Sequence, residues 1–255
     1  MAVIIKTKDQ ITGIRTSSRL AALALQETAK LIKPGATTES LDQFATEFIA
    51  KHQATAAPLN YGGYPKSICT SVNNVVCHGI PSTKKILKDC DIINIDITTI
   101  LNGFYGDVSA TFPVGEINQP AQLLISRTKA ALNLAIKSVK PCKFLNDCVG
   151  KVVESYVATF GYSPVHELGG HGVGLKFHED PFVFHFDNPT SPENILLRPG
   201  MIFTIEPMIN ASPNWHVTVD KHDGWTVYTA DGSLSCQFEH TILVTNSGSE
   251  ILTKI

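Results

Sequence analysis

DIINIDITTILNGFYGDVSATFP, residues 91–113, is the stretch that decides the fold. Asn102-Gly103 is the strongest short-range signal for a β-hairpin, because both residues tolerate the positive φ angles of a type I′ turn. With these two residues as the loop, Asp96 lies opposite Ser109. Asp107 is then a diagonal neighbour of Asp96 on the same face of the hairpin. The stretch therefore predicts two antiparallel strands that bring two aspartates together.

The two faces of this hairpin differ in character. Residues that point one way are polar, namely Asn94, Asp96, Thr98, Asp107, Ser109 and Thr111. Residues that point the other way are mostly apolar, namely Ile93, Ile95, Ile97, Val108, Ala110 and Phe112. Similar alternation predicts strands at 201–208 and 235–244, with Glu206 and Glu239 on their polar faces. A single strand of this kind is usually half exposed to solvent. Four strands with an acid on each polar face and no lysine there favour a sheet whose apolar back is covered by helices and whose polar front lines a cavity.

His171 lies in the glycine-rich run 169–174. Glycines let the backbone approach a ligand closely. A phosphate-binding loop is the competing interpretation, but neither G-x-G-x-x-G nor G-K-[ST] occurs there. His178 follows without an H-E-x-x-H helix, which argues against a zincin. His171 is therefore a candidate metal ligand.

Four carboxylates and one imidazole would repel one another or remain unpaired if they met without a cation. These candidate ligands are Asp96, Asp107, His171, Glu206 and Glu239. Oxygen donors with one imidazole suit Mn²⁺, Fe²⁺, Co²⁺ or Zn²⁺. A carboxylate can bridge two such ions about 3.5–4 Å apart. The five residues therefore predict a two-metal hydrolytic centre.

The bulk composition excludes several classes of protein. A net charge of −2 over 255 residues gives no footprint for nucleic acid or an anionic membrane. No apolar run approaches the roughly 18–20 residues of a membrane span, and the N-terminus does not resemble a secretory signal. Six dispersed cysteines without a C-x-x-C pair argue against structural zinc and fit reduced thiols. We expect a cytoplasmic enzyme.

A faint internal repeat organises the chain, which we expect to be one α/β (α+β) domain over 1–255. Ala24-Leu25 and Ile32-Lys33-Pro34 recur as Ala131-Leu132 and Val139-Lys140-Pro141. Each copy predicts a helix stopped by proline and then a second helix. The four predicted helices cover 7–32, 38–52, 119–139 and 145–160. Either the similarity is chance, or the regions of about 7–113 and 119–255 are halves related by a pseudo-two-fold axis.

Six motifs together carry a resemblance to a known family. They are NVVCHGIP (74–81), NID (94–96), GDVS (106–109), GHGVG (170–174), TIEP (204–207) and QFEH (237–240). In this order and at these spacings, the chain resembles the type 1 methionine aminopeptidases of the M24, or pita-bread, metallopeptidase family over essentially its whole length. The resemblance is to the compact bacterial form.

The resemblance implies a fold and an activity. The fold is the pita-bread fold, two pseudo-symmetric halves around a curved antiparallel sheet covered by helices. The activity is release of the initiator methionine from nascent proteins when the second residue is small and uncharged, through attack of a metal-activated hydroxide on the methionyl carbonyl.

Roles carry over motif by motif. Asp96 would bind one ion, Asp107 and Glu239 would bridge both, and His171 and Glu206 would complete the other. Glu206 would also shuttle a proton from the attacking water to the leaving amine. Two histidines would act on the substrate: His178 would donate to the scissile carbonyl, and His78 would contact the scissile amide or the next residue. Taken alone, either histidine is more often a core or surface residue.

The resemblance also implies a methionine pocket. It would be formed by Tyr61, Tyr64, Cys69, Phe177 and Trp225, although such residues are more often plain core. Aromatic and thiol walls suit a polarisable thioether. Gly62 and Pro58 stand where close relatives often carry a larger or more reactive side chain. We therefore expect a wider pocket entrance. The sequence does not decide whether this entrance changes which second residues of the substrate are accepted.

Two alternatives remain. One is an X-Pro aminopeptidase or prolidase, which shares a similar ligand set but usually carries a large N-terminal domain. The other is a catalytically inactive binding protein on the same fold, which would typically have lost metal ligands. Expected partners are nascent polypeptide N-termini, with docking near the ribosomal exit tunnel implied only by the family. We expect a monomer.

Overall fold

The predicted hairpin is present as strands β4 (Ile92–Leu101) and β5 (Phe104–Pro113) in the computed structural model, which describes residues 3–254. Asp96 pairs with Ser109, as predicted, and Thr98 pairs with Asp107. Asn102 and Gly103 have φ angles of 52° and 81°, as a type I′ turn requires. The register places both aspartates on one face.

β4 is the centre of a four-stranded sheet. It pairs with β5, with β1 (Thr55–Ala56) and with β2 (Cys69–Val72). A five-stranded sheet has the order β15-β14-β9-β7-β8, with bounds Ser249–Ile251, His240–Val244, Ile202–Ile205, Gly170–Gly172 and Glu179–Val183. Two three-stranded sheets have the orders β13-β10-β6 (Ser235–Gln237, Met208–Asn210, Ser163–Pro164) and β11-β12-β3 (Val217–Val219, Val227–Thr229, Val75–Cys77). Every pairing among the described strands is antiparallel. The predicted mixed α and β class is confirmed.

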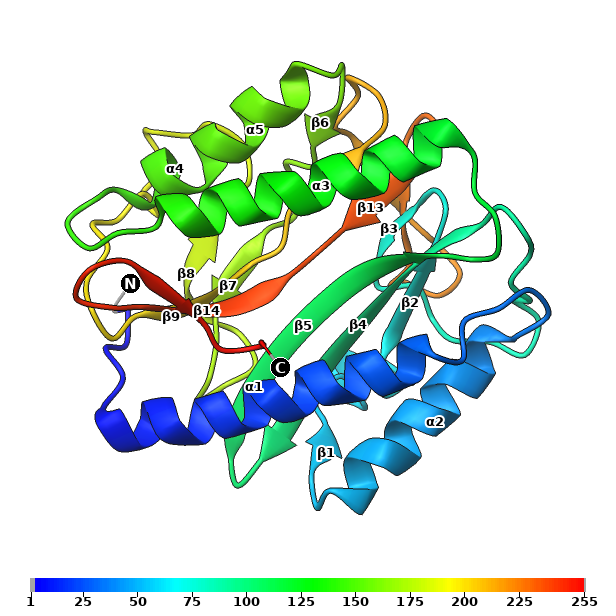
Figure 1. Ribbon diagram of the computed structural model, residues 1–255, viewed down its shortest axis with the longest axis horizontal. Coiled ribbons are helices and arrows are strands. Elements are labelled where there is room, and N and C mark those ends of the chain that lie inside the picture. The colour runs from blue at the N-terminus through cyan, green and yellow to red at the C-terminus, as the bar shows by residue number, and fades with distance from the viewer. Residues whose placement is uncertain (1–2, 255) are drawn as a thin grey trace.

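Helices form two groups around the strands, as Figure 1 shows. The first group is α1 (Lys8–Ala29) and α2 (Thr38–Lys51), and the second is α3 (Gln119–Ser138), α4 (Leu145–Cys148) and α5 (Gly150–Ala158). Thr7 begins α1 with a capping box, in which its side chain accepts from the backbone of Gln10. The apolar face of β4, with Ile93 and Ile95 fully buried, packs in one core cluster with residues of α1 and α2. This packing leaves the polar face of the hairpin for the interior cavity.

The fourth predicted helix, 145–160, is wrong as a single element. The structure breaks it into α4 and α5 at Val149, whose ψ of −73° departs from a regular helix. A Cβ added at Gly150 would lie 2.2 Å from the carbonyl oxygen of Phe186, so only glycine permits this approach. The other three helices are found close to the predicted ranges. The symmetry of the halves 7–113 and 119–255 within one domain stays a prediction.

The two predicted strands 201–208 and 235–244 are interrupted rather than continuous. β9 ends at Ile205 and β10 begins at Met208, while β13 ends at Gln237 and β14 begins at His240. Pro207 has no backbone N–H to donate to the ladder, which is one physical reason for the break. β9 pairs with β14 on one side of the gap and β10 pairs with β13 on the other. Glu206 and Glu239 lie in the gap.

Hydrogen bonds join the polar face of the hairpin to this interrupted pair. Asn94 Nδ2 donates to the Gln237 carbonyl over 2.9 Å, and Thr111 Oγ1 donates to the same oxygen over 2.7 Å. The backbone N–H of Glu239 donates to the Ser109 carbonyl over 2.9 Å. The hairpin of the first half and the C-terminal strands of the second half therefore meet where the four candidate carboxylate ligands lie.

Candidate active site

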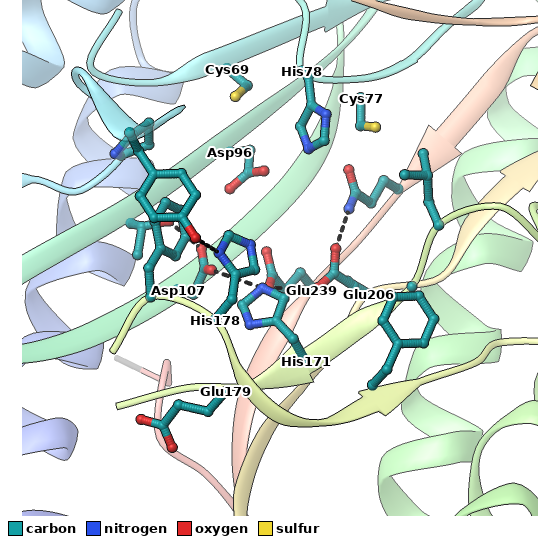
Figure 2. A pocket seen from close by; sticks show the side chains of 18 of the residues that line it. Cys69, Cys77, His78, Asp96, Asp107, His171, His178, Glu179, Glu206 and Glu239 are labelled. Atoms are coloured by element: carbon teal, nitrogen blue, oxygen red, sulfur yellow. Dashed lines mark hydrogen bonds and ion pairs between the residues drawn. The ribbon is translucent and has the colours of Figure 1, made fainter. Parts of the chain in front are cut away.

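One cavity of about 730 Å³ contains every residue predicted from the sequence to act in catalysis, metal binding or methionine binding. Its lining includes Asp96, Asp107, His171, Glu206, Glu239, His78, His178, Tyr61, Tyr64, Cys69, Phe177 and Trp225. Figure 2 shows residues of the lining, with His171 and His178 grouped at its centre beside the carboxylates of Asp107, Glu206 and Glu239. The spatial premise of the sequence analysis, that these distant residues converge, is confirmed. Their individual roles stay predictions.

The hairpin positions Asp96 and Asp107. Asp107 is 3% exposed, and its Oδ1 accepts a 2.6 Å hydrogen bond from Thr98 Oγ1. Burial raises the pKa of Asp107 to about 7, although the Thr98 hydrogen bond works in the other direction. Burial and the neighbouring Asp107 charge raise the pKa of Asp96 well above its usual range. Both carboxylates are therefore in surroundings that disfavour an uncompensated negative charge.

His171 on β7 presents a lone pair to the carboxylates. Its Nδ1 lies 3.0 Å from the Gly172 carbonyl oxygen, which can only accept, so Nδ1 carries the proton. Its Nε2 lies 3.7 Å from Asp107 Oδ2 and 3.6 Å from Glu206 Oε1. Burial lowers the pKa of His171 to about 3, which keeps the ring neutral. Three acceptor atoms therefore face one another, an arrangement that calls for a cation between them.

Glu206 lies in the gap between β9 and β10, and three neighbours fix it. Its Oε1 accepts from Thr204 Oγ1 over 2.7 Å, and its Oε2 accepts from Gln237 Nε2 over 3.1 Å. Its backbone N–H donates to His185 Nε2 over 3.0 Å. Thr204 Oγ1 also accepts from the backbone N–H of His171 over 2.9 Å, so one hydroxyl ties two candidate ligands together.

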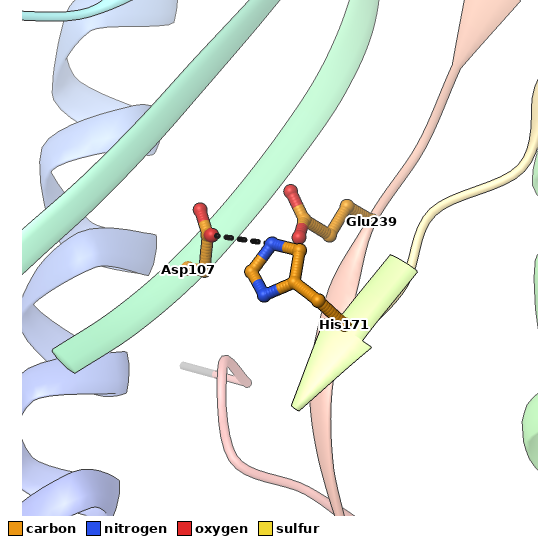
Figure 3. A group of neighbouring side chains, drawn as sticks. All are labelled: Asp107, His171 and Glu239. Carbon is orange, nitrogen blue, oxygen red and sulfur yellow. Dashed lines mark ion pairs between the residues drawn. The ribbon is translucent and has the colours of Figure 1, made fainter. Parts of the chain in front are cut away.

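Glu239 completes the group from the gap between β13 and β14. It is 2% exposed, and burial followed by the charges of Asp107 and Glu206 raises the pKa of its carboxyl well above the usual range. Ligand atoms of Asp107, His171 and Glu239 all lie within 4.8 Å of one another. Figure 3 shows these three side chains turned toward a common point. These three side chains could hold a divalent metal ion.

The donor set fits divalent metal ions. Among residues 3–254, no lysine or arginine forms an ion pair with any of the four buried carboxylates. Buried carboxylates without a partner are costly, and bound cations are one of the ways in which proteins compensate them. Oxygen donors with one neutral imidazole match first-row divalent ions.

His178 is held by a residue that the sequence analysis assigned only to the methionine pocket. Its Nδ1 lies 2.9 Å from the hydroxyl of Tyr61. Burial lowers the pKa of His178, so the ring is neutral at pH 7. When the Tyr61 hydroxyl donates to Nδ1, the proton of the ring is on Nε2. His178 is then a hydrogen-bond donor toward the cavity.

His78 has a left-handed backbone, with a φ of 56°. Such a conformation is uncommon for a residue other than glycine and often marks a functional position. The next residue, Gly79, packs against the backbone of Thr70, since a Cβ there would lie 2.2 Å from the Thr70 carbonyl oxygen. Burial lowers the pKa of His78 to about 4, so this ring is also neutral.

The predicted methionine pocket is an aromatic wall of the same cavity. Tyr61 and Phe177 have ring centroids 4.8 Å apart, and Tyr64 and Trp225 meet edge to face at 5.2 Å. The Tyr64 hydroxyl is anchored 3.1 Å from the carbonyl oxygens of both Ile68 and Gly79.

Pro58 and Gly62 are the two residues at the pocket entrance that differ from those of close relatives. Pro58 lines the cavity. A Cβ added at Gly62 would lie 3.2 Å from the Trp225 ring. A side chain at this position would crowd Trp225, so Gly62 allows the ring to approach the backbone closely, and a wider entrance with an effect on substrate choice stays a prediction.

Sequence reasoning missed the residues that support the ligands. Thr98, Thr204 and Gln237 lie in the strands predicted from alternation, but the sequence did not identify them as partners of Asp107 and Glu206. His185 was not identified at all, although the alternation of half-buried and buried residues over 182–186 places it on the inner side of its segment.

Comparison with known proteins agrees with this geometry. The model of metallopeptidase family M24 matches residues 12–246. Methionine aminopeptidase of Escherichia coli (strain K12) is 47% identical over 254 residues, which is 99% of this chain and 94% of the relative. The crystal structure of methionine aminopeptidase from Rickettsia prowazekii has a TM-score of 0.95 at 45% identity and covers 99% of this chain and 100% of that one.

A more distant likeness is limited to the fold. Prolidase from Pyrococcus furiosus has a TM-score of 0.75 at 23% identity, over 99% of this chain and 66% of that chain. The resemblance to methionine aminopeptidases and the pita-bread fold that it implied are confirmed by the closer matches. Together with a buried site suited to divalent metal, these matches establish that the chain belongs to metallopeptidase family M24.

Proposed function

We propose that this metal-dependent aminopeptidase releases N-terminal methionine from polypeptides whose second residue is small and uncharged. The observation that carries the proposal is the presence, in one cavity, of the metal-ligand set and an aromatic pocket suited to a thioether. The likeness to proteins named methionine aminopeptidase at 45–47% identity supports it.

We also propose two divalent ions for the site. Asp96 would hold one, His171 and Glu206 would hold the other, and Asp107 with Glu239 would be shared. Candidate ions are manganese, iron, cobalt and zinc, all of which accept this donor set. When bound, the ions supply Lewis-acid charge and lower the pKa of water in the site.

The protein's own residues then perform the remaining steps. The pocket formed by Tyr61, Tyr64, Cys69, Phe177 and Trp225 would hold the methionine side chain and so fix the position of its carbonyl. His178, with Nε2 protonated, would donate to the carbonyl oxygen and stabilise negative charge as it develops there. His78 would hold the scissile amide or the next residue in line.

Glu206 moves the proton. Its carboxylate would accept a proton from the attacking water and pass it to the leaving amine nitrogen as the peptide bond breaks. Burial and the neighbouring acids raise the pKa of Glu206 in the metal-free protein, and bound cations would counteract this shift. Thr204 and Gln237 hold its two oxygens in place and so reduce the reorganisation needed for transfer.

The decisive experiment is an activity assay on metal-free protein. Each candidate ion is added back separately, and amino acid release is measured from a Met-Ala-Ser peptide, a Met-Lys-Ser peptide and an Ala-Pro peptide. Release of methionine from the first peptide alone supports the proposal. Cleavage of Ala-Pro in preference would favour an X-Pro aminopeptidase, and no release with any ion would favour a non-catalytic binding protein.

None of the helices within residues 3–254 has the length and apolar character to span a bilayer. Several other expectations stay predictions. Cytoplasmic location, a monomeric state, nascent chains as substrates and docking near the ribosomal exit tunnel are each proposals from the family resemblance.

A further inference from the structure

An aromatic stripe leaves the cavity along the segment after β8. We define it by six rings, those of Phe182, Phe184, Phe186, His166, Trp215 and His216. Phe182 lines the cavity but is not part of the predicted methionine pocket. The other five rings play no part in the proposed reaction.

The stripe arises from period-two alternation. Val183 and His185 are buried, whereas Phe182, Phe184 and Phe186 are half-buried on the opposite side of the segment. Consecutive phenylalanine rings are in contact, with centroids 4.7 Å and 5.1 Å apart. Three half-buried phenylalanine rings therefore stand on the outer side of one short segment.

The stripe continues onto two other segments. His166 is stacked between Phe186 and Trp215, at centroid distances of 3.8 Å and 4.2 Å. Trp215 in turn lies 3.7 Å from the ring of His216, which is exposed. Side chains from residues 166, 182–186 and 215–216 therefore form one path that starts at the catalytic cavity.

Carboxylates flank the far end of this path. Glu154 Oε1 lies 3.8 Å from His166 Nε2, and Glu167 Oε1 lies 3.4 Å from His216 Nδ1. Burial lowers the pKa of His166, so that ring does not neutralise Glu154 at pH 7. Aromatic faces beside acidic groups attract aromatic side chains and the guanidinium of arginine.

We propose that the aromatic stripe binds the substrate polypeptide downstream of its second residue, with a preference for aromatic or basic side chains there. This inference rests on the proposed function, because a substrate whose first residue is in the pocket must leave the cavity as a continuing chain. Five ring-to-ring steps of 3.7–5.1 Å give the stripe a contour of at most roughly 20 Å. An extended chain rises about 3.3 Å per residue, so the stripe spans at most about six residues.

The experiment compares a short and a long substrate that share their first residues. Methionine release is measured from Met-Ala-Ser and from an octapeptide that begins Met-Ala-Ser and continues with arginine and tryptophan. The variants are Trp215→Ala and Phe184→Ala, and Leu134→Ala, which removes an exposed apolar side chain from α3, is the matched control. Melting temperatures confirm that each variant is folded.

We expect the octapeptide to have the lower KM in the unmodified protein. Trp215→Ala and Phe184→Ala should each raise that KM roughly five- to tenfold, as loss of one aromatic anchor does at other interfaces. The KM for Met-Ala-Ser and all values for Leu134→Ala should be unchanged. Equal KM values for both peptides, or a loss confined to the short peptide, would overturn the stripe as a binding path.

A binding measurement separates this inference from the proposed function. Fluorescence anisotropy of a dye-labelled octapeptide is recorded on the same proteins without turnover. If no peptide releases methionine with any ion, the proposed function fails, but weaker octapeptide binding by Trp215→Ala would still support the stripe. Unchanged binding in both stripe variants would reject it whatever the activity shows.

Discussion

The two aspartates and the two glutamates of the site are held in different ways. Asp96 and Asp107 lie within β4 and β5, where ten consecutive residue pairs fix the register. Glu206 and Glu239 lie in gaps between short strands, where the ladder is interrupted. The hairpin therefore positions its ligands by backbone pairing, whereas Glu206 in the second half is positioned by side-chain hydrogen bonds from Thr204 and Gln237.

The difference has a functional reason. A carboxylate in a regular ladder is rigidly fixed, which suits a ligand that does nothing but bind a cation. A carboxylate at an interruption has more freedom and can be tuned by its hydrogen-bond partners. Glu206, to which we assign proton transfer, is the residue with donors on both oxygens.

The largest expected effect is on turnover in the Glu206→Gln variant. The amide keeps the size of the side chain but cannot accept and pass on a proton, so kcat should fall by roughly 10²–10⁴, the usual contribution of general acid–base catalysis. Steady-state kinetics on Met-Ala-Ser with saturating metal measures this. Melting temperature serves as the folding control. Turnover near that of the unmodified protein would show that Glu206 is not the proton carrier.

Metal binding distinguishes a shared ligand from an unshared one. Asp107→Ala should weaken the binding of both ions by more than about 100-fold. Loss of a residue that only supports a metal ligand already lowers metal affinity by up to about 100-fold. Asp96→Ala should lose one ion and keep the other. Metal content after equilibration with a limiting ion, measured on both variants, checks the comparison. Unchanged stoichiometry in Asp107→Ala would contradict the bridging role that the family resemblance implies for this residue.

The contrast between the two regions also explains which parts of the molecule the sequence predicts. The hairpin depends on local information, namely Asn102-Gly103 and unbroken alternation, so its register and the convergence of Asp96 with Asp107 were predicted correctly. The breaks at Glu206 and Glu239 depend on pairing between residues far apart in the chain. Alternation places both glutamates on polar faces but does not reveal that the strands stop beside them.

The supporting residues were hidden for the same reason. The Thr204 hydroxyl accepts a hydrogen bond from the backbone N–H of His171, which lies on another strand. No local sequence pattern predicts that hydrogen bond. Tyr61 was assigned to the methionine pocket from its motif, whereas its bond to His178 Nδ1 depends on how two loops meet. The motifs therefore identified the residues at the site, and the structure was needed to identify their partners.

Threonine-to-valine substitutions compare the two modes of support directly. Thr204→Val removes the bond to Glu206 and leaves the His171 N–H without its acceptor, so metal affinity should fall toward the 100-fold end of the usual 10–100-fold range. Thr98→Val removes one bond to Asp107, which the ladder still holds, so the loss should be about tenfold. Metal titrations of the two variants test the order. Equal losses would mean that backbone pairing confers no advantage.

The smallest effect is on the stability of the metal-free protein as pH rises. Between pH 6.5 and 8, unfolded carboxyls are ionised, while in the folded state the raised pKa values of the four site carboxyls, about 7 for Asp107, keep protons bound. The folded state then binds more protons than the unfolded state, so the free energy of unfolding falls as pH increases. Buried histidines offset part of this trend near pH 6.5, because an unfolded histidine still binds a proton there whereas the lowered pKa values of His171 and His185, both about 3, keep the folded rings neutral. This opposing contribution fades as the pH rises toward 8, and the four carboxyls dominate. Urea unfolding of chelator-treated protein at the two pH values should show lower stability at pH 8, and Asp96→Asn, which removes one buried charge, should reduce the difference. Added divalent ion should flatten the dependence, because a bound cation compensates the carboxylates of both the continuous and the interrupted strands.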